Sequence, residues 1–336
     1  MKQRLFVTLS LAGLAMATFG ATKPKTAIKS LNKTTIQQPT YTEWHDLQVN
    51  AINRFPLHTD FFTYPADDWV YEKDGKIVSK DILHMNKAES KYFLSLDGTW
   101  KFNWVANADQ RPTDFYKEDL DDSKWKTMNL PGIWEMNGFG DPEYVNVGFG
   151  WRGHFDQQPP AVPTKDNHVG SYRRIIDIPA NWDGKQVVAH FGSVTSNIYL
   201  YVNGKFAGYA EDSKVAAEFD ITPYLKKGKN LIAFQTFRWC DGSWDEDQDF
   251  WRLSGVARES YLFARDAQLH LEDIRVTPDL VNNYKDGVLN ISAKVKGTGK
   301  LNFILFDKEG KQVATATGLA KNGTANITMN VENPHK

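Results

Sequence analysis

The sequence has almost no cysteine. A single Cys240 stands among its 336 residues, which excludes an intrachain disulfide and a cysteine-rich metal site. The chain also lacks an excess of charge of either sign, because 40 basic residues nearly balance 41 acidic ones. A near-neutral chain has no electrostatic reason to bind a polyanion, so we expect no nucleic-acid partner.

Long hydrophobic runs are absent as well. The main candidate, Leu5 to Ala17, is shorter than the roughly 20 residues that a membrane-spanning helix needs. Basic residues precede this run and a small-x-small pattern ends it, as in a secretory signal peptide. We therefore predict a signal peptide at residues 1–21, a polar linker at 22–40, no membrane span, and export, most simply to a bacterial periplasm.

Aromatic residues, in contrast, are plentiful, at 13% of the chain with eleven tryptophans. Four aromatic rings and five carboxylates fall within the fifteen residues from Arg238 to Arg252. Aromatic faces stack on the apolar face of a sugar ring, and carboxylates accept hydrogen bonds from its hydroxyls or bind a hard cation. The segment therefore favours a sugar-binding site. An acidic surface turn whose tryptophans pack in a core is the alternative that composition leaves open.

Short runs rich in β-forming residues, separated by turn residues, predict an all-β fold. Residues 41–265 indicate an antiparallel sandwich, and residues 267–336 a second β unit. Asn203-Gly204 predicts a two-residue hairpin, since both residues tolerate positive φ. The candidate strands of the first part are Gly98 to Val105, Tyr172 to Ile178, Gln186 to Phe191, Ile198 to Val202, Leu231 to Phe237 and Ser260 to Ala264. Those of the second are Gln268 to Val276, Val288 to Val295, Leu301 to Phe306, Gln312 to Thr317 and Ala325 to Val331.

An ordered set of short motifs resembles those of the large β-galactosidases of glycoside hydrolase family 2. The set includes Asn53-Arg54, Leu96-Asp97-Gly98-Thr99-Trp100, Leu130-Pro131-Gly132-Ile133-Trp134, Tyr144-Val145-Asn146, Tyr201-Val202-Asn203-Gly204, Asp247-Gln248-Asp249 and Trp251-Arg252. The resemblance implies a jelly-roll, galactose-binding-like sandwich followed by an immunoglobulin-like sandwich. The second sandwich is expected to be incomplete, because such a domain has about seven strands. The family's catalytic (β/α)₈ barrel is absent, because it needs about 250 residues of alternating strand and helix.

The resemblance assigns a substrate-positioning role to two residues. Asn146 and Asp249 are expected to hydrogen-bond galactose hydroxyls, and Asp249 to ligate a sodium ion as well. Their chemistry agrees, since Asn offers a donor and an acceptor, whereas Asp offers only acceptors and suits a hard cation. No catalytic residue is expected in this chain, because both catalytic glutamates of the family lie on the barrel, as does the expected stacking ring. A local catalytic pair of Glu246 and Asp249 is disfavoured.

A structural divalent-cation site is a further expectation from the resemblance. Its matching positions are Glu43, Asp46, Val49, Glu211 and Asp241. Several of these differ from the family's residues, with acids at Asp46 and Glu211 in place of a neutral amide. Oxygen ligands of this kind suit magnesium or calcium, while a solvated acidic face remains the alternative.

The sequence thus predicts the N-terminal part of a secreted β-galactosidase that hydrolyses terminal non-reducing β-D-galactosides with retention. Sodium, with magnesium or calcium, is expected for the complete enzyme, and its oligomeric state stays open. Two alternatives remain. One is a free-standing carbohydrate-binding module, and the other is a different family 2 activity such as β-glucuronidase or β-mannosidase.

Overall fold

The computed structural model describes residues 4–10, 37–65, 70–73, 76–79, 86–146, 148, 150–151, 158–246 and 249–334. These residues form β-strands and short 3₁₀ turns but no α-helix, which confirms the all-β prediction, and they contain no (β/α)₈ barrel. No helix among them is long and apolar enough to cross a membrane. Two compact units form, here called the large unit (residues 36–57 and 91–264) and the small unit (1–35, 58–90 and 265–336).

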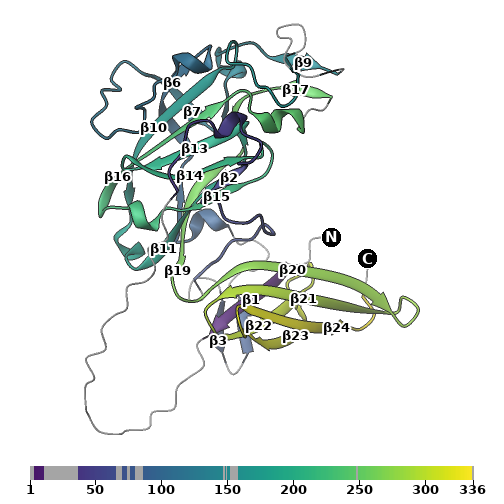
Figure 1. Cartoon of the computed structure of the whole chain (residues 1–336). Helices are drawn as coiled ribbons and strands as arrows, with labels where there is room; N and C mark the ends of the chain where they lie inside the picture. Colours follow the sequence, from purple (N-terminus) through teal and green to yellow (C-terminus); the bar gives the residue numbers. More distant parts are fainter. Residues whose placement is uncertain are drawn as a thin grey trace. The chain divides into compact units, whose positions relative to one another are not determined.

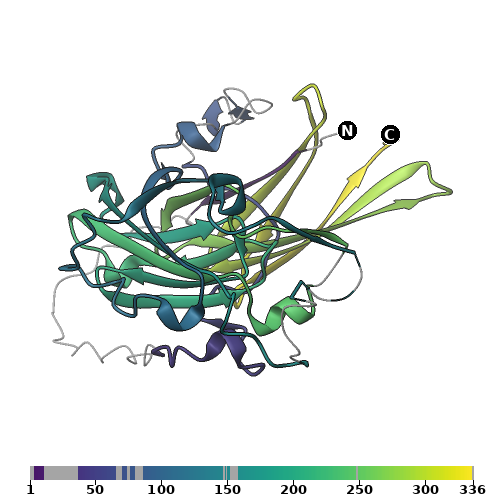
Figure 2. The same cartoon turned by 90° about the horizontal axis from the view of Figure 1, so that it is seen from above.

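The large unit is a sandwich of two main antiparallel sheets. Its seven-stranded sheet has the order β2-β14-β13-β16-β10-β6-β7, and its four-stranded sheet has the order β15-β11-β19-β5. Figure 2 shows the teal and green strands of this unit lying side by side. The strands are β2 (Ala51–Ile52), β5 (Phe93–Ser95), β6 (Gly98–Val105), β7 (Lys126–Leu130), β10 (Val169–Ile178), β11 (Lys185–Phe191), β13 (Asn197–Val202), β14 (Lys205–Glu211), β15 (Ala217–Asp220), β16 (Gly228–Phe237) and β19 (Ser260–Asp266).

Smaller elements complete the large unit. A short sheet joins β12 (Val194–Thr195), β18 (Gly255–Val256) and β8 (Gly132–Ile133). A separate ribbon pairs β9 (Glu143–Val145) with β17 (Phe250–Arg252). The 3₁₀ turns of this unit are η1 (Glu43–His45), η3 (Ala108–Gln110), η4 (Glu135–Asn137), η5 (Ala180–Trp182), η6 (Thr222–Tyr224) and η7 (Asp241–Trp244).

Central strand β13 is buried on both faces. Ile198 and Leu200 face the core between the two main sheets. Tyr199 and Tyr201 face a second apolar cluster on the opposite side of the seven-stranded sheet. Successive side chains of a strand point to opposite faces, so burial of both faces requires an uninterrupted apolar run such as the one seen here. This sheet is therefore a rigid platform for the loops at its ends.

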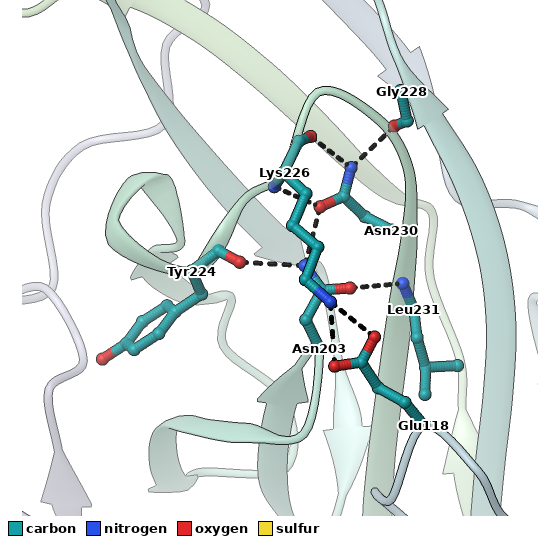
Figure 3. A network of polar contacts seen from close by, with 7 residues as sticks. All are labelled: Glu118, Asn203, Tyr224, Lys226, Gly228, Asn230 and Leu231. Atoms are coloured by element: carbon teal, nitrogen blue, oxygen red, sulfur yellow. Dashed lines mark hydrogen bonds and ion pairs between the residues drawn. The ribbon is translucent and has the colours of Figure 1, made fainter.

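The hairpin predicted at Asn203-Gly204 is confirmed. Asn203 and Gly204 both have positive φ, 49° and 76°, and they connect β13 to β14. The Asn203 amide donates to the Tyr224 carbonyl at 2.9 Å and to Asn230 Oδ1 at 2.7 Å, and its Oδ1 accepts from the Leu231 backbone N–H at 2.9 Å (Figure 3). The amide group of the turn residue is thus bound both to the neighbouring strand β16 and to η6.

The small unit contains two three-stranded sheets. Their orders are β20-β21-β24 and β1-β22-β23, with a core of Leu271, Ile291, Phe303 and Met329 among others. Figure 1 shows the long strands of this unit. Its strands are β1 (Arg4–Ser10), β3 (Val70–Lys73), β4 (Lys76–Ser79), β20 (His270–Val281), β21 (Asp286–Lys296), β22 (Lys300–Phe306), β23 (Gln312–Leu319) and β24 (Thr324–Val331), and its 3₁₀ turn is η2 (Lys87–Glu89). The five predicted strands of this part correspond to β20 through β24.

Two features of the small unit differ from the predicted segment boundaries. Residues 58–90 group with this unit rather than with residues 91–264, because Phe61 packs against its core and the Thr59 backbone N–H donates to Asp273 at 3.2 Å. Strand β1 lies within the predicted signal peptide and pairs antiparallel with β22. The signal peptide and the immunoglobulin-like assignment stay predictions, and of the predicted linker only residues 37–40 are described.

Candidate functional site

The two predicted sugar-binding residues adjoin the ribbon of β9 and β17, which is labelled in Figure 1. Its register pairs Phe250 with Val145 and Trp251 with Tyr144. Asn146 directly follows Val145 and Asp249 directly precedes Phe250, so both adjoin the same paired end of the ribbon. Both residues are exposed. The ribbon thus brings close together two segments about a hundred residues apart in the sequence.

Three side chains meet at this ribbon, those of Tyr144, Asp249 and Trp251. Tyr144 and Trp251 are opposite each other in the ribbon, and Asp249 lies within hydrogen-bond distance of Tyr144. The Tyr144 hydroxyl donates to Asp249 Oδ1 at 2.5 Å. The rings of Tyr144 and Trp251 lie 5.6 Å apart, centroid to centroid, and remain 52% and 54% exposed. Polar and aromatic groups are thus combined on a surface that is open to solvent.

Asp249 raises the pKa of the Tyr144 hydroxyl, because its carboxylate accepts the hydrogen bond that only the protonated phenol can donate. Tyr144 therefore stays a donor at neutral pH. The donated bond also holds one oxygen of Asp249 in place. The second oxygen can accept from a sugar hydroxyl or contact a cation.

Other side chains anchor the ribbon to the large unit. Lys214 Nζ and the Arg252 guanidinium lie 5.4 Å and 4.8 Å from the centre of the Phe250 ring. Arg238, which is buried, donates to the Glu143 carboxylate at 3.0 Å. The contacts of Lys214 with Phe250 and of Arg238 with Glu143 thus connect both strands of the ribbon to the large unit.

Glu246 is tied to the fold rather than free for chemistry. Its Oε1 accepts from the Ser213 backbone N–H at 2.7 Å. Asp247 and Gln248, which belong to the same motif, lie outside the described residues.

The second predicted cluster also comes together in part. Side-chain ligand atoms of Glu211, Cys240 and Asp241 lie within 4.8 Å of one another, and all three residues are buried. Glu211 Oε2 and Asp241 Oδ2 are buried oxygens with no hydrogen-bond partner. Gly242 makes this approach feasible, because a Cβ at its position would lie 2.9 Å from Glu211 Oε2.

Burial of two negatively charged carboxylates next to each other costs free energy, so one of them tends to stay protonated. Burial, together with the charge of Asp241, raises the pKa of Glu211 to about 9. Burial likewise raises the pKa of the Cys240 thiol far above its ordinary value, so it stays protonated. The cluster therefore offers oxygen ligands, which fit magnesium or calcium better than a thiolate-seeking metal. These two acids would hold such a cation.

The remaining three predicted ligands lie in and just after η1, which is adjacent to η7. Burial alone would raise the pKa of Glu43, but hydrogen bonds from Thr40 at 2.5 and 2.8 Å and from Tyr199 at 3.0 Å lower it below its ordinary value. Asp46 Oδ1 accepts from the Gln48 backbone N–H at 3.1 Å, and Val49 packs on the second apolar cluster. Glu43 is thus already satisfied by protein donors, unlike the paired oxygens of Glu211 and Asp241.

A buried histidine beside Arg238 predicts acid sensitivity. Arg238 can only donate, so its 3.3 Å contact with His168 Nδ1 requires that nitrogen to be unprotonated, while Nε2 lies 3.0 Å from Asp166 Oδ1. Burial first, and then Arg238, lower the pKa of His168, although Asp166 and Asp141 oppose this. The unfolded state then binds the proton more readily. This stabilising contribution is fully present above the unfolded pKa of about 6.5 and is lost as pH falls through the lower folded pKa.

When the pH is lowered from about 7 to about 5, we expect the urea concentration at the unfolding midpoint of the large unit to decrease. The decrease should be smaller in His168→Gln, because the glutamine amide can still donate and accept hydrogen bonds without titrating. Tryptophan fluorescence measures the midpoint. An equal fall in both proteins would contradict the assignment.

The sequence did not predict the contacts of Tyr144 with Asp249 and Trp251. The available signal was their spacing, because each stands two residues from a predicted sugar ligand. Their hydrogen bond and ring contact depend on the pairing of β9 with β17, which no local pattern indicates.

Comparison with known proteins identifies the family. Residues 93–266, more than half of the chain, match the model of the Glycosyl hydrolases family 2, sugar binding domain. The chain is 35% identical over 309 residues to a beta-galactosidase of Priestia megaterium, covering 88% of this chain and 29% of that protein. It is 31% identical over 297 residues to a beta-galactosidase large subunit of Leuconostoc lactis, covering 84% of this chain and 44% of that protein.

Solved structures agree on the fold. A beta-glucuronidase of Bifidobacterium dentium superposes with a TM-score of 0.56 at 17% identity, covering 74% of this chain and 43% of that one. A glycosyl hydrolase family 2 member from Bacteroides cellulosilyticus superposes with a TM-score of 0.52 at 22% identity, covering 73% of this chain and 32% of that one. The chain spans less than half the length of each of these relatives. On the extent of the family match, the chain belongs to glycosyl hydrolase family 2, with its sugar-binding domain at residues 93–266.

Proposed function

We propose that this chain is the substrate-positioning N-terminal part of an exported β-galactosidase, which hydrolyses terminal non-reducing β-D-galactosides with retention. The observation that carries the proposal is the pairing of β9 with β17, because the exposed residues Asn146 and Asp249 directly adjoin the same paired end of this ribbon. An amide and a carboxylate so placed can bind neighbouring hydroxyls of one sugar ring. The beta-galactosidases that resemble this chain over most of its length support the choice of substrate.

The chain contributes binding rather than bond cleavage. Retaining glycosidases need two carboxyl groups about 5 to 5.5 Å apart, one as acid and base and one as nucleophile. In our proposal both come from a catalytic barrel in another part of the protein. Asn146 and Asp249 hold galactose hydroxyls, and the free oxygen of Asp249 also contacts a sodium ion.

The isolated chain is therefore expected to show no turnover of an aryl β-galactoside. Release of the coloured aglycone from the purified chain, measured beside a family 2 β-galactosidase, checks this. Activity that stays with the chain through successive purification steps would contradict the proposed division of labour.

We further expect the complete enzyme to use sodium and a structural magnesium or calcium ion held by Glu211 and Asp241. Saturation with a cation at about 100 times its dissociation constant stabilises the folded state by about 2.7 kcal/mol, or about 5 to 10 °C in unfolding temperature. Calorimetry of the chain with magnesium, calcium or a chelator measures this rise.

Glu211→Gln is the matched test of this cation site. It mimics the protonated acid, so the cation-free unfolding temperature should stay close to that of the parent while the response to cation disappears. Glu118→Gln, at an exposed acid paired with Lys226, should retain the full response. A full response in Glu211→Gln would place the cation elsewhere.

Two other functions have observations in their favour. The similar beta-glucuronidase structures leave that activity open, although the negative charge of Asp249 favours a neutral ring over a glucuronate.

A free-standing carbohydrate-binding module would need useful affinity by itself. With two exposed polar residues we expect only millimolar galactoside binding, since millimolar affinity already needs about 4 kcal/mol. Micromolar affinity of the isolated chain would favour the binding module.

A further inference from the structure

A small cavity in the large unit is lined by residues from segments that are distant in the sequence. Its volume is about 30 Å³. Ser213 and Lys214 come from the segment between β14 and β15, Arg238 follows β16, and Arg252 belongs to β17. A cavity of this size has room for one or two water molecules or for a monatomic ion, and it is too small for a sugar ring.

The described side chains that line this cavity carry more positive than negative charge. Lys214, Arg238 and Arg252 are cationic, and Glu246 is the one carboxylate among these side chains. Burial lowers the pKa of Lys214. Glu246 opposes this effect, whereas Arg258 and Arg252 add to it. The cavity therefore has an electrostatic reason to attract a negative charge.

Two buried donors at the cavity have no acceptor among the described residues. The Ser213 hydroxyl and Arg238 Nε make no hydrogen bond, although the other nitrogens of Arg238 contact Glu143 at 3.0 Å and His168 at 3.3 Å. A buried donor without an acceptor costs free energy unless a bound water molecule or ion satisfies it. The side chains of Lys and Arg can only donate hydrogen bonds. A water molecule would add further donors and no charge, whereas a monatomic anion accepts only and offsets the positive charge.

We propose that this cavity, here called the anion pocket, binds one chloride ion through the Ser213 hydroxyl, Arg238 Nε–H and the Lys214 ammonium group. The inference goes beyond the proposed function, because it concerns neither the sugar nor the metal cations. The bound ion connects the segment after β14 with the end of β16, and its charge also attracts Arg252 on β17. Chloride thus stabilises the part of the large unit to which the β9–β17 ribbon is attached.

Thermal unfolding of the full 336-residue chain in sodium chloride and in sodium methanesulfonate tests the anion pocket. The sodium concentration and the ionic strength are kept equal, so the predicted sodium site makes the same contribution in both salts. Chloride at about ten times its dissociation constant should raise the unfolding temperature of the large unit by about 3 to 6 °C. Methanesulfonate, which is larger than the cavity, should give no saturable rise. Broadening of the chlorine NMR signal by the chain measures chloride binding independently of stability.

Ser213→Ala and Lys214→Gln each remove one of the proposed ligands. Ser213→Ala takes away a hydroxyl that has no partner in the fold, so its unfolding temperature without chloride should stay close to that of the parent while the chloride response falls by more than half. Lys214→Gln should lose the response as well. Lys227→Gln, at a lysine whose side chain is 93% exposed, is the control that should keep the full response.

A water-filled cavity predicts a different set of results. A full chloride response in Ser213→Ala or in Lys214→Gln would overturn the anion pocket. An equal rise in methanesulfonate would attribute the effect to ionic strength and would overturn it too. So would a parent chain that shows no rise in chloride and no broadening of the chlorine signal.

Discussion

Asp249→Asn, in a complete enzyme that carries this chain, is expected to lower galactosidase activity by about one to two decades. Loss of a charge-assisted hydrogen bond costs about 1.5 to 3 kcal/mol, and the whole cost appears in the rate if the bond is made in the transition state. Asparagine keeps the size of the side chain but removes the charge that a sodium ion needs. Steady-state kinetics with an aryl β-galactoside, across a range of sodium concentrations, measure both effects.

Glu246→Gln is the matched control for this prediction. It makes the same acid-to-amide change three residues away, on a side chain whose Oε1 accepts from the Ser213 backbone N–H at 2.7 Å. A glutamine oxygen can accept that bond too, so the activity should stay within a small factor of the parent. Equal losses in the two variants, or an unchanged sodium dependence in Asp249→Asn, would contradict the role given to Asp249.

Phe234→Ala should produce the largest loss of stability. Phe234 is fully buried and joins the two main sheets, stacking on Tyr172 at 4.3 Å and contacting Trp100 and Phe191 at 5.3 Å each. Removing a buried phenylalanine ring in a close-packed core costs about 3 to 5 kcal/mol, because the cavity that it leaves cannot collapse. Urea unfolding of the large unit, followed by near-ultraviolet circular dichroism, measures the loss.

Ile175→Ala is the control on a neighbouring strand. Ile175 belongs to β10, which pairs with β16, but its side chain is 65% exposed. Its replacement should change the free energy of unfolding by about 0.5 kcal/mol or less. A similar small loss in Phe234→Ala would mean that the core between the sheets is loosely packed.

Strand positions could be predicted from the sequence because their signal is local. The interval Gly98 to Val105 was predicted from its β-forming residues and is strand β6. Turn chemistry is equally local, since only residues that tolerate positive φ fit the Asn203-Gly204 turn. The grouping of residues 58–90 with the small unit was not predictable in this way, because it depends on which core receives Phe61.

In the candidate site, too, the sequence predicts residue types while the tertiary structure determines their surroundings. A resemblance of short motifs predicts Asn146 and Asp249 as sugar ligands, and their residue types suit hydrogen bonding to hydroxyls. Likewise, Glu211 and Asp241 were candidates for a cation from the sequence, but their shared burial, and the pKa of about 9 that it gives Glu211, follow from folding.

The sequence by itself determined the all-β class, the positions of the main strands, the near-neutral charge and the residue types available for binding sugar. Only the tertiary structure decided that Tyr144 contacts both Asp249 and Trp251, because that requires β9 to pair with β17 in a particular register. Local patterns depend on the geometry of neighbouring residues along the chain. Pairing across about a hundred residues depends instead on the competition of all strands for partners and burial, which no single segment encodes.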